Sequence, residues 1–125
     1  MAILPLFVFV GCSDDDEPKF DYPMETLYGT WTGSEVKVDG DWVDITKYPY
    51  TKFGFSITFN SGGTYSGDGY FGNGGGTYKA EGKIITTYID GEEYARYTVK
   101  SLTDNNAELT MSMGGESMEI RVKKK

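Results

Sequence analysis

The sequence has no histidine and a single cysteine, Cys12, among its 125 residues. Without an imidazole there is no Ser-His-Asp or Cys-His catalytic arrangement, and no histidine to hold a metal ion. A lone cysteine has no partner for a disulfide within the chain. We therefore expect no enzyme, no metal site and no disulfide. A body of about 100 residues is long enough to fold on an apolar core of its own.

Positive charge and proline are also scarce. The chain has 12 Lys and Arg against 19 Asp and Glu, which gives a net charge of −7. An acidic surface repels phosphate backbones, so nucleic acid is not an expected partner. The basic residues 123–125 are interpreted as a solubilising end to the last strand rather than a docking patch. None of the four prolines lies beyond Pro49, so the later chain can form uninterrupted strands.

A short apolar segment precedes the cysteine. Residues 2–10 are uncharged and interrupted only by Pro5. The segment is shorter than the roughly 20 residues that span a bilayer, and it fits the apolar region of a signal peptide. Gly11 is the small residue expected just before a cleavage site. No Lys or Arg precedes Lys19, so the usual positive segment is absent.

The motif Phe9-Val10-Gly11-Cys12 resembles a bacterial lipobox, with Phe9 where leucine is usual. The resemblance implies that residues 1–11 are a signal peptide, truncated at its start, and that the thiol of Cys12 carries a diacylglycerol. Two or three acyl chains anchor a protein stably, whereas one binds only marginally. The alternative is a buried free cysteine beside a hydrophobic strand, but the acids that follow are poor neighbours for a core strand. We expect no cofactor beyond this lipid.

An acidic run follows the cysteine directly. Ser13-Asp14-Asp15-Asp16-Glu17 has two compatible interpretations. It is a solvated spacer, as blocks of like charge usually are. It also resembles the surface-export signal of lipoproteins in Bacteroidetes-type bacteria. We assign residues 12–26 to the acylated cysteine and an acidic, disordered tether. We expect a lipid-anchored outer-membrane protein. The resemblance to an export signal implies exposure at the cell surface, whereas a plain spacer leaves the periplasmic and the outward-facing leaflet both open.

From residue 27 onward, apolar and polar residues alternate. Phe53, Phe55, Ile57 and Phe59 share one predicted face, and no segment has the 3.6-residue apolar period of a long helix. Turn sequences such as Asp39-Gly40 separate the segments. The predicted strands span 28–38, 42–47, 53–60, 64–71, 76–80, 83–89, 92–102, 107–113 and 117–123. Residues 72–76 are predicted to be a mobile hairpin loop.

Short links favour an up-and-down meander of about eight or nine antiparallel strands. An open meander leaves two exposed edges, and closing it into a barrel removes them. The fold class is therefore all-β, an antiparallel meander closing into a small barrel.

Leu27-Tyr28-Gly29-Thr30-Trp31 places a Gly-x-Trp motif at the start of the first strand. Together with the meander, it resembles the lipocalin-like domain of small lipoproteins from Bacteroides-type bacteria. The resemblance covers residues 27–123, and we assign residues 27–125 to one lipocalin-like barrel domain. It implies that Gly29 allows close backbone approach and that Trp31 packs across the barrel floor, both structural roles.

Aromatic residues are the best candidates for binding. Tyrosine rings on a barrel rim can stack on sugars or anchor a protein partner, and inside the barrel they can line a small pocket. Alternatively, they cover outer strand faces and pair across the sheet. The acid pairs Glu92-Glu93 and Asp41 with Asp44 are interpreted as ordinary solvated charges. The candidate ligand or partner contacts are Tyr65, Tyr70, Phe71, Tyr78, Tyr88, Tyr94 and Tyr97.

The sequence thus predicts a non-enzymatic cell-envelope lipoprotein that binds a small apolar ligand or a glycan. The alternative is a protein-interaction, accessory or inhibitor subunit at the outer-membrane surface. The expected partners are the membrane, through the lipid, and a small ligand, glycan or envelope protein.

Overall fold

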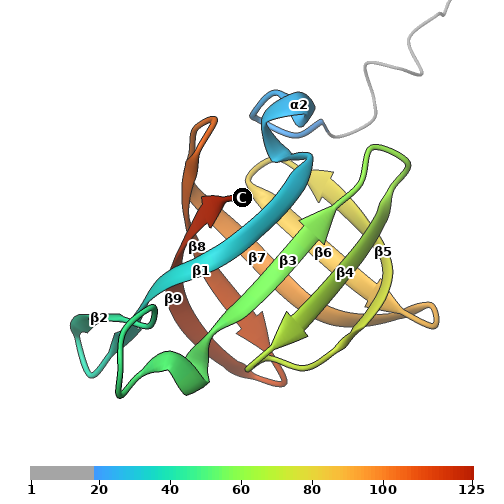
Figure 1. Ribbon diagram of the computed structural model, residues 1–125. Helices are drawn as coiled ribbons and strands as arrows, with labels where there is room; N and C mark the ends of the chain where they lie inside the picture. Colours follow the sequence, from blue (N-terminus) through green and yellow to red (C-terminus); the bar gives the residue numbers. More distant parts are fainter. Residues whose placement is uncertain (1–18) are drawn as a thin grey trace, which may run out of the picture.

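All strand pairs are antiparallel in the computed structural model, which describes residues 19–125, and every strand but the second pairs with the next strand of the chain (Figure 1). Two short helical segments accompany them, α2 (Met24–Leu27) and a 3-10 turn (Thr51–Phe53). The predicted all-β meander is confirmed. The strands are β1 (Gly29–Val38), β2 (Asp41–Asp44), β3 (Phe55–Phe59), β4 (Thr64–Gly69), β5 (Gly74–Glu81), β6 (Ile84–Ile89), β7 (Glu92–Leu102), β8 (Asn106–Met113) and β9 (Glu116–Lys124).

The sheet closes because β1 pairs on both of its edges. On one edge it pairs with β9, where Trp31 lies opposite Lys124. On the other edge its first half pairs with β3 and its second half with β2. Since β2 and β3 follow each other along the same edge, the barrel wall has eight strands and β2 is an addition. Closure leaves no long unpaired edge in the wall, as predicted.

Several strand boundaries differ from the prediction: β2 ends at Asp44 rather than residue 47, and β4 ends at Gly69 rather than residue 71. The predicted strand 53–60 begins two residues late, because the chain joins the barrel wall again only at Phe55. Phe53 ends the 3-10 turn instead of extending β3. Its place in the apolar alternation reflects packing against neighbouring aromatic rings rather than strand pairing.

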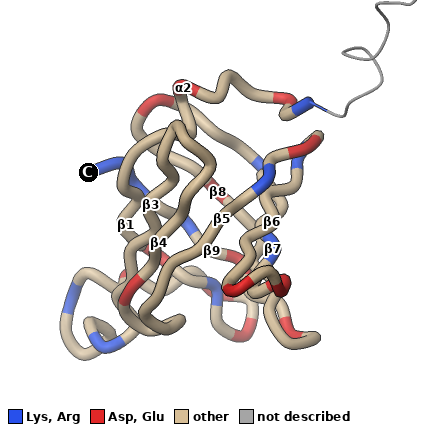
Figure 2. The backbone as a smooth tube through the Cα atoms, turned by 90° about the vertical axis from the view of Figure 1, so that its right-hand side faces the viewer, with Lys and Arg blue, Asp and Glu red and all other residues tan. Residues whose placement is uncertain are grey.

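An ion network on the outer face crosses the seam between β1 and β9. Arg121 on β9 lies 3.1 Å from a carboxylate oxygen of Glu35 on β1 and 3.1 Å from one of Glu108 on β8. Its guanidinium also sits 3.8 Å from the ring centroid of Trp42 on β2. Single exposed pairs add little stability, but this network links four neighbouring strands. In Figure 2, β3 is drawn in tan without blue or red, because none of its residues is charged.

The core lies inside the barrel, filled by alternate residues of the strands. Phe55, Ile57 and Phe59 of β3 are all buried, as are Ala107 and Leu109 of β8. Successive strand side chains point to opposite faces, so β3, β7 and β8 place every second residue of their buried stretches in the core. This agrees with the alternation read from the sequence.

The glycine run after β4 is more ordered than predicted. The loop comprises residues 70–73, and Gly74–Gly76 belong to β5, where they pair with β4. The prediction of a mobile loop over residues 72–76 is therefore wrong for these three. Glycine is required here because strands approach closely: a Cβ on Gly76 would lie 1.8 Å from the carbonyl oxygen of Tyr88. A glycine run thus marked close backbone approach rather than a loose turn.

The first described residues lie against the end of the barrel where β1 begins. The amide of Gly82, in the turn between β5 and β6, donates to the carbonyl of Lys19, and Asp21 donates back to the carbonyl of Gly82, both at 2.8 Å. Phe20 forms an isolated bridge with Gly82. The part of the predicted tether that the structure describes is thus held on the barrel.

The predicted signal peptide (residues 1–11), the predicted lipidation site Cys12 and the predicted export residues Ser13–Glu17 lie outside the described residues. Within residues 19–125 no helix is both long and apolar enough to cross a bilayer.

Candidate functional site

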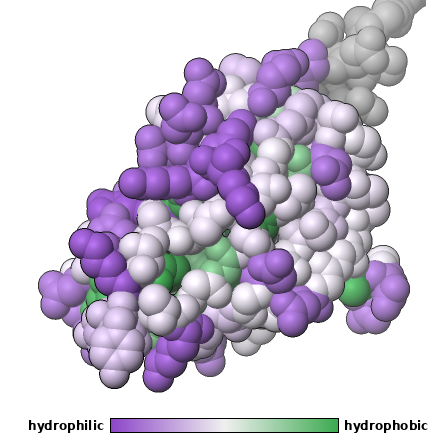
Figure 3. Space-filling model, viewed as in Figure 1, coloured by the Kyte–Doolittle hydropathy of each residue, from purple (hydrophilic) through white to green (hydrophobic). Residues whose placement is uncertain are grey.

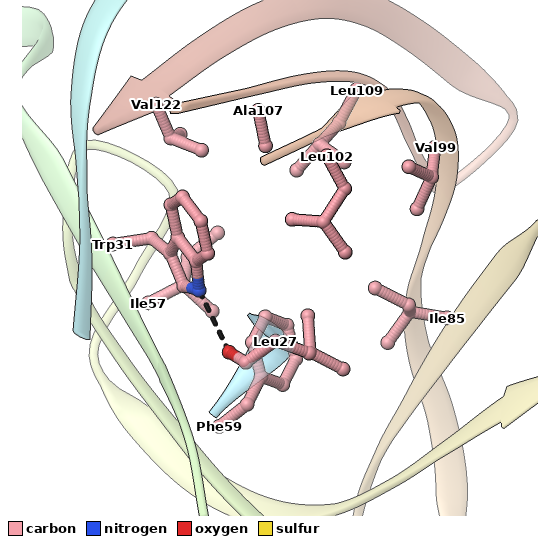
Figure 4. A pocket seen from close by; sticks show the side chains of 10 residues that line it. All are labelled: Leu27, Trp31, Ile57, Phe59, Ile85, Val99, Leu102, Ala107, Leu109 and Val122. Carbon is pink, nitrogen blue, oxygen red and sulfur yellow. Dashed lines mark hydrogen bonds between the residues drawn. The ribbon is translucent and has the colours of Figure 1, made fainter. Parts of the chain in front are cut away.

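The two ends of the barrel differ. We call the end at Trp31 the floor, and the opposite end, where Phe55, Phe71 and Tyr94 meet, the capped end. The indole of Trp31 is 2% exposed, and its Nε1 donates a 2.8 Å hydrogen bond to the carbonyl of Leu27 (Figure 4). Lys124 lies 4.9 Å from the ring centroid and donates to the carbonyl of Thr26 at 2.7 Å. These contacts hold α2 in place across the floor of the barrel.

The space behind the floor is small. Its lining is apolar, with Ile85, Val99 and Leu109 facing Trp31 across it (Figure 4). Its volume is about 10 Å³, close to the smallest that holds one water molecule. An eight-stranded barrel is just wide enough to be filled by side chains or to hold one small ligand. At the floor, side chains fill it.

The capped end gathers aromatic residues from several strands. Phe55 of β3, Tyr65 of β4 and Tyr97 of β7 are buried there, and Tyr94 of β7 is partly buried. A second space of about 10 Å³ lies among them and Phe71. Together they form an aromatic cluster with three phenol hydroxyls.

The loop of residues 70–73 closes this end. The Phe71 ring meets the Phe55 ring edge-on, with centroids 4.8 Å apart. The hydroxyl of Tyr94 donates a 2.7 Å hydrogen bond to the carbonyl oxygen of Phe71. Within the loop, the amide of Gly69 donates to the side-chain oxygen of Asn73 at 3.0 Å. Phe71 therefore plugs the barrel at the end opposite Trp31.

Burial raises the pKa values of two phenols in this cluster, those of Tyr65 and Tyr97. Burial raises the pKa of Tyr97 well above its usual value, and the neighbouring Tyr65 and Tyr94 add to the effect. The pKa of Tyr65 is also raised, mainly by burial and then by Tyr94. At neutral pH these groups are hydrogen-bond donors as well as acceptors.

Aromatic rings continue from the capped end to the surface. The Tyr70 ring lies 5.1 Å from that of Phe71 and 4.9 Å from that of Phe53, and Tyr50 stacks on Phe53 at 6.5 Å. Tyr70 is 51% exposed and Tyr48 is 90% exposed. Figure 3 shows pale and green surface between hydrophilic side chains in the lower left part of the molecule, where Figure 1 shows β2.

The structure divides the seven aromatic candidates among three places. Tyr65, Tyr94, Tyr97 and Phe71 come together at the capped end, with Tyr70 beside them.

Tyr78 lies near the floor, where its hydroxyl donates to the carbonyl of Asn60 at 2.8 Å. Tyr88 is half-buried on β6, opposite Thr77 and Glu93. The sequence did not single out Phe55, whose alternation marked it only as core. The available signal was the pair Tyr70-Phe71 enclosed by two glycines.

The acid pairs are engaged at the surface. Arg96 donates to Glu93 at 2.9 Å. Hydrogen bonds from the Thr46 hydroxyl and amide hold the pKa of Asp44 below its usual value. Within residues 19–125 no group of three or more Cys, Asp and Glu side chains is placed to hold a metal ion.

The architecture defines a class: an eight-stranded up-and-down antiparallel barrel, a class used for ligand binding and typically non-enzymatic. The sequence model of the lipocalin-like domain matches residues 27–109, more than half of the chain. The chain belongs to the lipocalin-like domain family. The match ends within β8, and the structure adds β9, which closes the barrel on β1. No curated protein matches the sequence.

Proposed function

We propose that this chain is a non-enzymatic, lipid-anchored cell-envelope protein that binds a small apolar ligand or a glycan at the capped end of its barrel. The observation that carries the proposal is the aromatic cluster at that end, which runs from the buried Phe55 to the exposed Tyr70. Ligand sites are typically lined by apolar and aromatic side chains with a few placed polar groups, and the Tyr94 hydroxyl is the polar group at this end.

The position of the chain's first described residues supports an outward-facing capped end. Lys19 is hydrogen-bonded to the turn between β5 and β6, at the floor (Figure 1). Seven residue steps separate it from Cys12, a reach of at most about 25 Å. A lipid on Cys12 keeps the floor toward the membrane and the aromatic cluster away from it.

The anchor is tested by fractionation of cells that express the full chain. Cys12→Ala is expected to move the protein from the membrane to the soluble fraction, because acyl chains supply the membrane affinity. Ser13→Ala is the matched control and is expected to stay membrane-bound. Retention of Cys12→Ala at the membrane, or an unmodified Cys12 by mass spectrometry, contradicts the lipoprotein proposal.

Surface display has a separate test. Replacing residues 14–17 together with alanine is expected to protect the protein from protease added outside intact cells, because the acidic export signal is lost. The matched control replaces Asp41, Glu92, Asp104 and Glu116 with alanine, which removes four exposed acids without touching the run. Equal digestion of the four-alanine variant and the unchanged chain contradicts the export role.

A protein-interaction, accessory or inhibitor subunit is the second candidate. Tyr48 is favoured as an anchor because it is 90% exposed and large interface aromatics carry much of the binding energy in protein complexes. If this candidate holds, Tyr48→Ala weakens a co-purified complex while ligand binding at the capped end is unchanged.

A further inference from the structure

The loop that caps the barrel presents an aromatic ring and a carbonyl oxygen to the barrel's own residues. The ring of Phe71 packs on Phe55, and its carbonyl oxygen accepts the hydrogen bond from Tyr94. Both groups belong to one residue, and together they form a 3-phenylpropanoyl unit. Phe71 thus occupies the place that a small aryl molecule with a carbonyl oxygen can take.

The attachment of this loop is light compared with that of the floor. Phe71 is only partly buried, whereas Trp31 is 2% exposed. Within and beside the loop, Phe71 lies between Gly69 at φ +100° and Gly72 at φ +107°, backbone conformations that glycine adopts without strain. Segments with few buried contacts open at lower free energy than the core does.

When the Phe71 ring moves out, the volume that it leaves stays open and lined by side chains, because few neighbouring side chains can fill it. The neighbouring hairpin has six glycines among residues 67–76, so it brings few side chains to fill a vacated volume. Phe55, Ile57, Tyr65 and Tyr97 bound the space from the other sides. Apolar voids of about 150 Å³ in protein cores take up benzene-sized molecules.

We propose that residues 70–73 are a displaceable cap. A small aryl molecule with a carbonyl or amide oxygen binds in place of Phe71, its ring on Phe55 and its oxygen at the Tyr94 hydroxyl. This inference rests on the proposed function and narrows it to one ligand class at the same end of the barrel.

The test uses 3-phenylpropanamide, with binding to the full chain measured by calorimetry or NMR titration. Phe71→Ala is expected to bind the probe at least about tenfold more tightly than the unchanged chain, because the probe no longer competes with the Phe71 ring. Adding Tyr94→Phe to Phe71→Ala is expected to weaken binding about three- to tenfold through the lost hydrogen bond. Propanamide, which lacks the ring, is expected not to bind.

Tyr78→Phe is the matched control for Tyr94→Phe. It also removes one phenol-to-carbonyl hydrogen bond, but near the floor, so probe affinity is expected to be unchanged. Equal affinity in Phe71→Ala and the unchanged chain overturns the proposal, and so does weakening by Tyr78→Phe that equals the effect of Tyr94→Phe.

If Phe71→Ala does not fold, the proposal is tested by probe binding to the unchanged chain. The proposal then requires saturable probe binding whose shifted NMR signals include Tyr94 and Asn73 but not Leu27 at the floor, and any other pattern overturns it. The measurement needs no membrane. If the probe does not bind as expected, the cap proposal is wrong but the lipid anchor tested by Cys12→Ala is unaffected. If the Cys12→Ala fractionation fails instead, the lipid anchor is wrong but the cap proposal is unaffected.

Discussion

Replacing Trp31 with phenylalanine tests how much the hydrogen bond of its indole stabilises the barrel floor. Trp31→Phe keeps an aromatic ring in the core but removes the Nε1 donor, whose 2.8 Å bond to the Leu27 carbonyl is buried. Leu27 is itself 3% exposed, so its carbonyl does not regain a water partner easily. The substitution therefore leaves a buried acceptor unpaired at the end of α2.

The magnitude follows from two contributions. An unpaired buried acceptor costs about 1–3 kcal/mol of unfolding free energy. The smaller ring leaves a void, and removal of even one buried methylene costs about 0.5–1.5 kcal/mol. The expected loss is therefore about 2–4 kcal/mol, a large share of the roughly 5–15 kcal/mol that stabilises a typical domain.

The assay is urea unfolding followed by far-ultraviolet circular dichroism, which does not depend on which tryptophan remains. Trp42→Phe is the matched control, since Trp42 lies on the outer face under Arg121. Loss of that cation–π contact is expected to cost only about 0.5–1 kcal/mol. With urea slopes near 1–3 kcal/mol/M, the Trp31→Phe midpoint is expected to fall by about 1–2 M. A Trp31→Phe variant as stable as Trp42→Phe refutes the stabilisation of the floor by this hydrogen bond.

Further predictions concern close strand approach and buried phenols. Gly76→Ala is expected to cost at least about 2 kcal/mol of unfolding free energy, because its Cβ would meet the Tyr88 carbonyl. Gly62→Ala is the control: its Cβ meets no atom within 4 Å, so the unfolding free energy is expected to change by no more than about 0.5 kcal/mol. Equal urea midpoints for the two variants contradict this prediction. Above pH about 10, stability is expected to fall because the unfolded Tyr97 loses its proton while the folded one keeps it; Tyr97→Phe is expected to flatten this decline by up to about 1.4 kcal/mol per pH unit, and an unchanged slope in urea titrations contradicts it.

Strand positions were predictable because period-two burial is a local signal. Phe55, Ile57 and Phe59 alternate with small polar residues, and each is buried as expected. Closure was predictable from the cost of open edges. The same reasoning misplaced Phe53, because the excursion after β2 depends on aromatic contacts far apart in the sequence.

The filling of the barrel could not be read from the sequence. A tyrosine count does not say which rings point inward, and Tyr78 near the floor is indistinguishable in pattern from Tyr65 at the capped end. The plug is less predictable still. Phe71 meets Phe55 only because the glycines around it allow the loop to fold back over the barrel.

The most direct measurement is the set of intermolecular nuclear Overhauser effects between 3-phenylpropanamide and the unchanged chain. The displaceable cap predicts contacts from the ring protons of the probe to Phe55 and Tyr97, with displaced signals for Phe71. Contacts to Leu27 or Trp31 at the floor, or to the outer strand faces alone, contradict it.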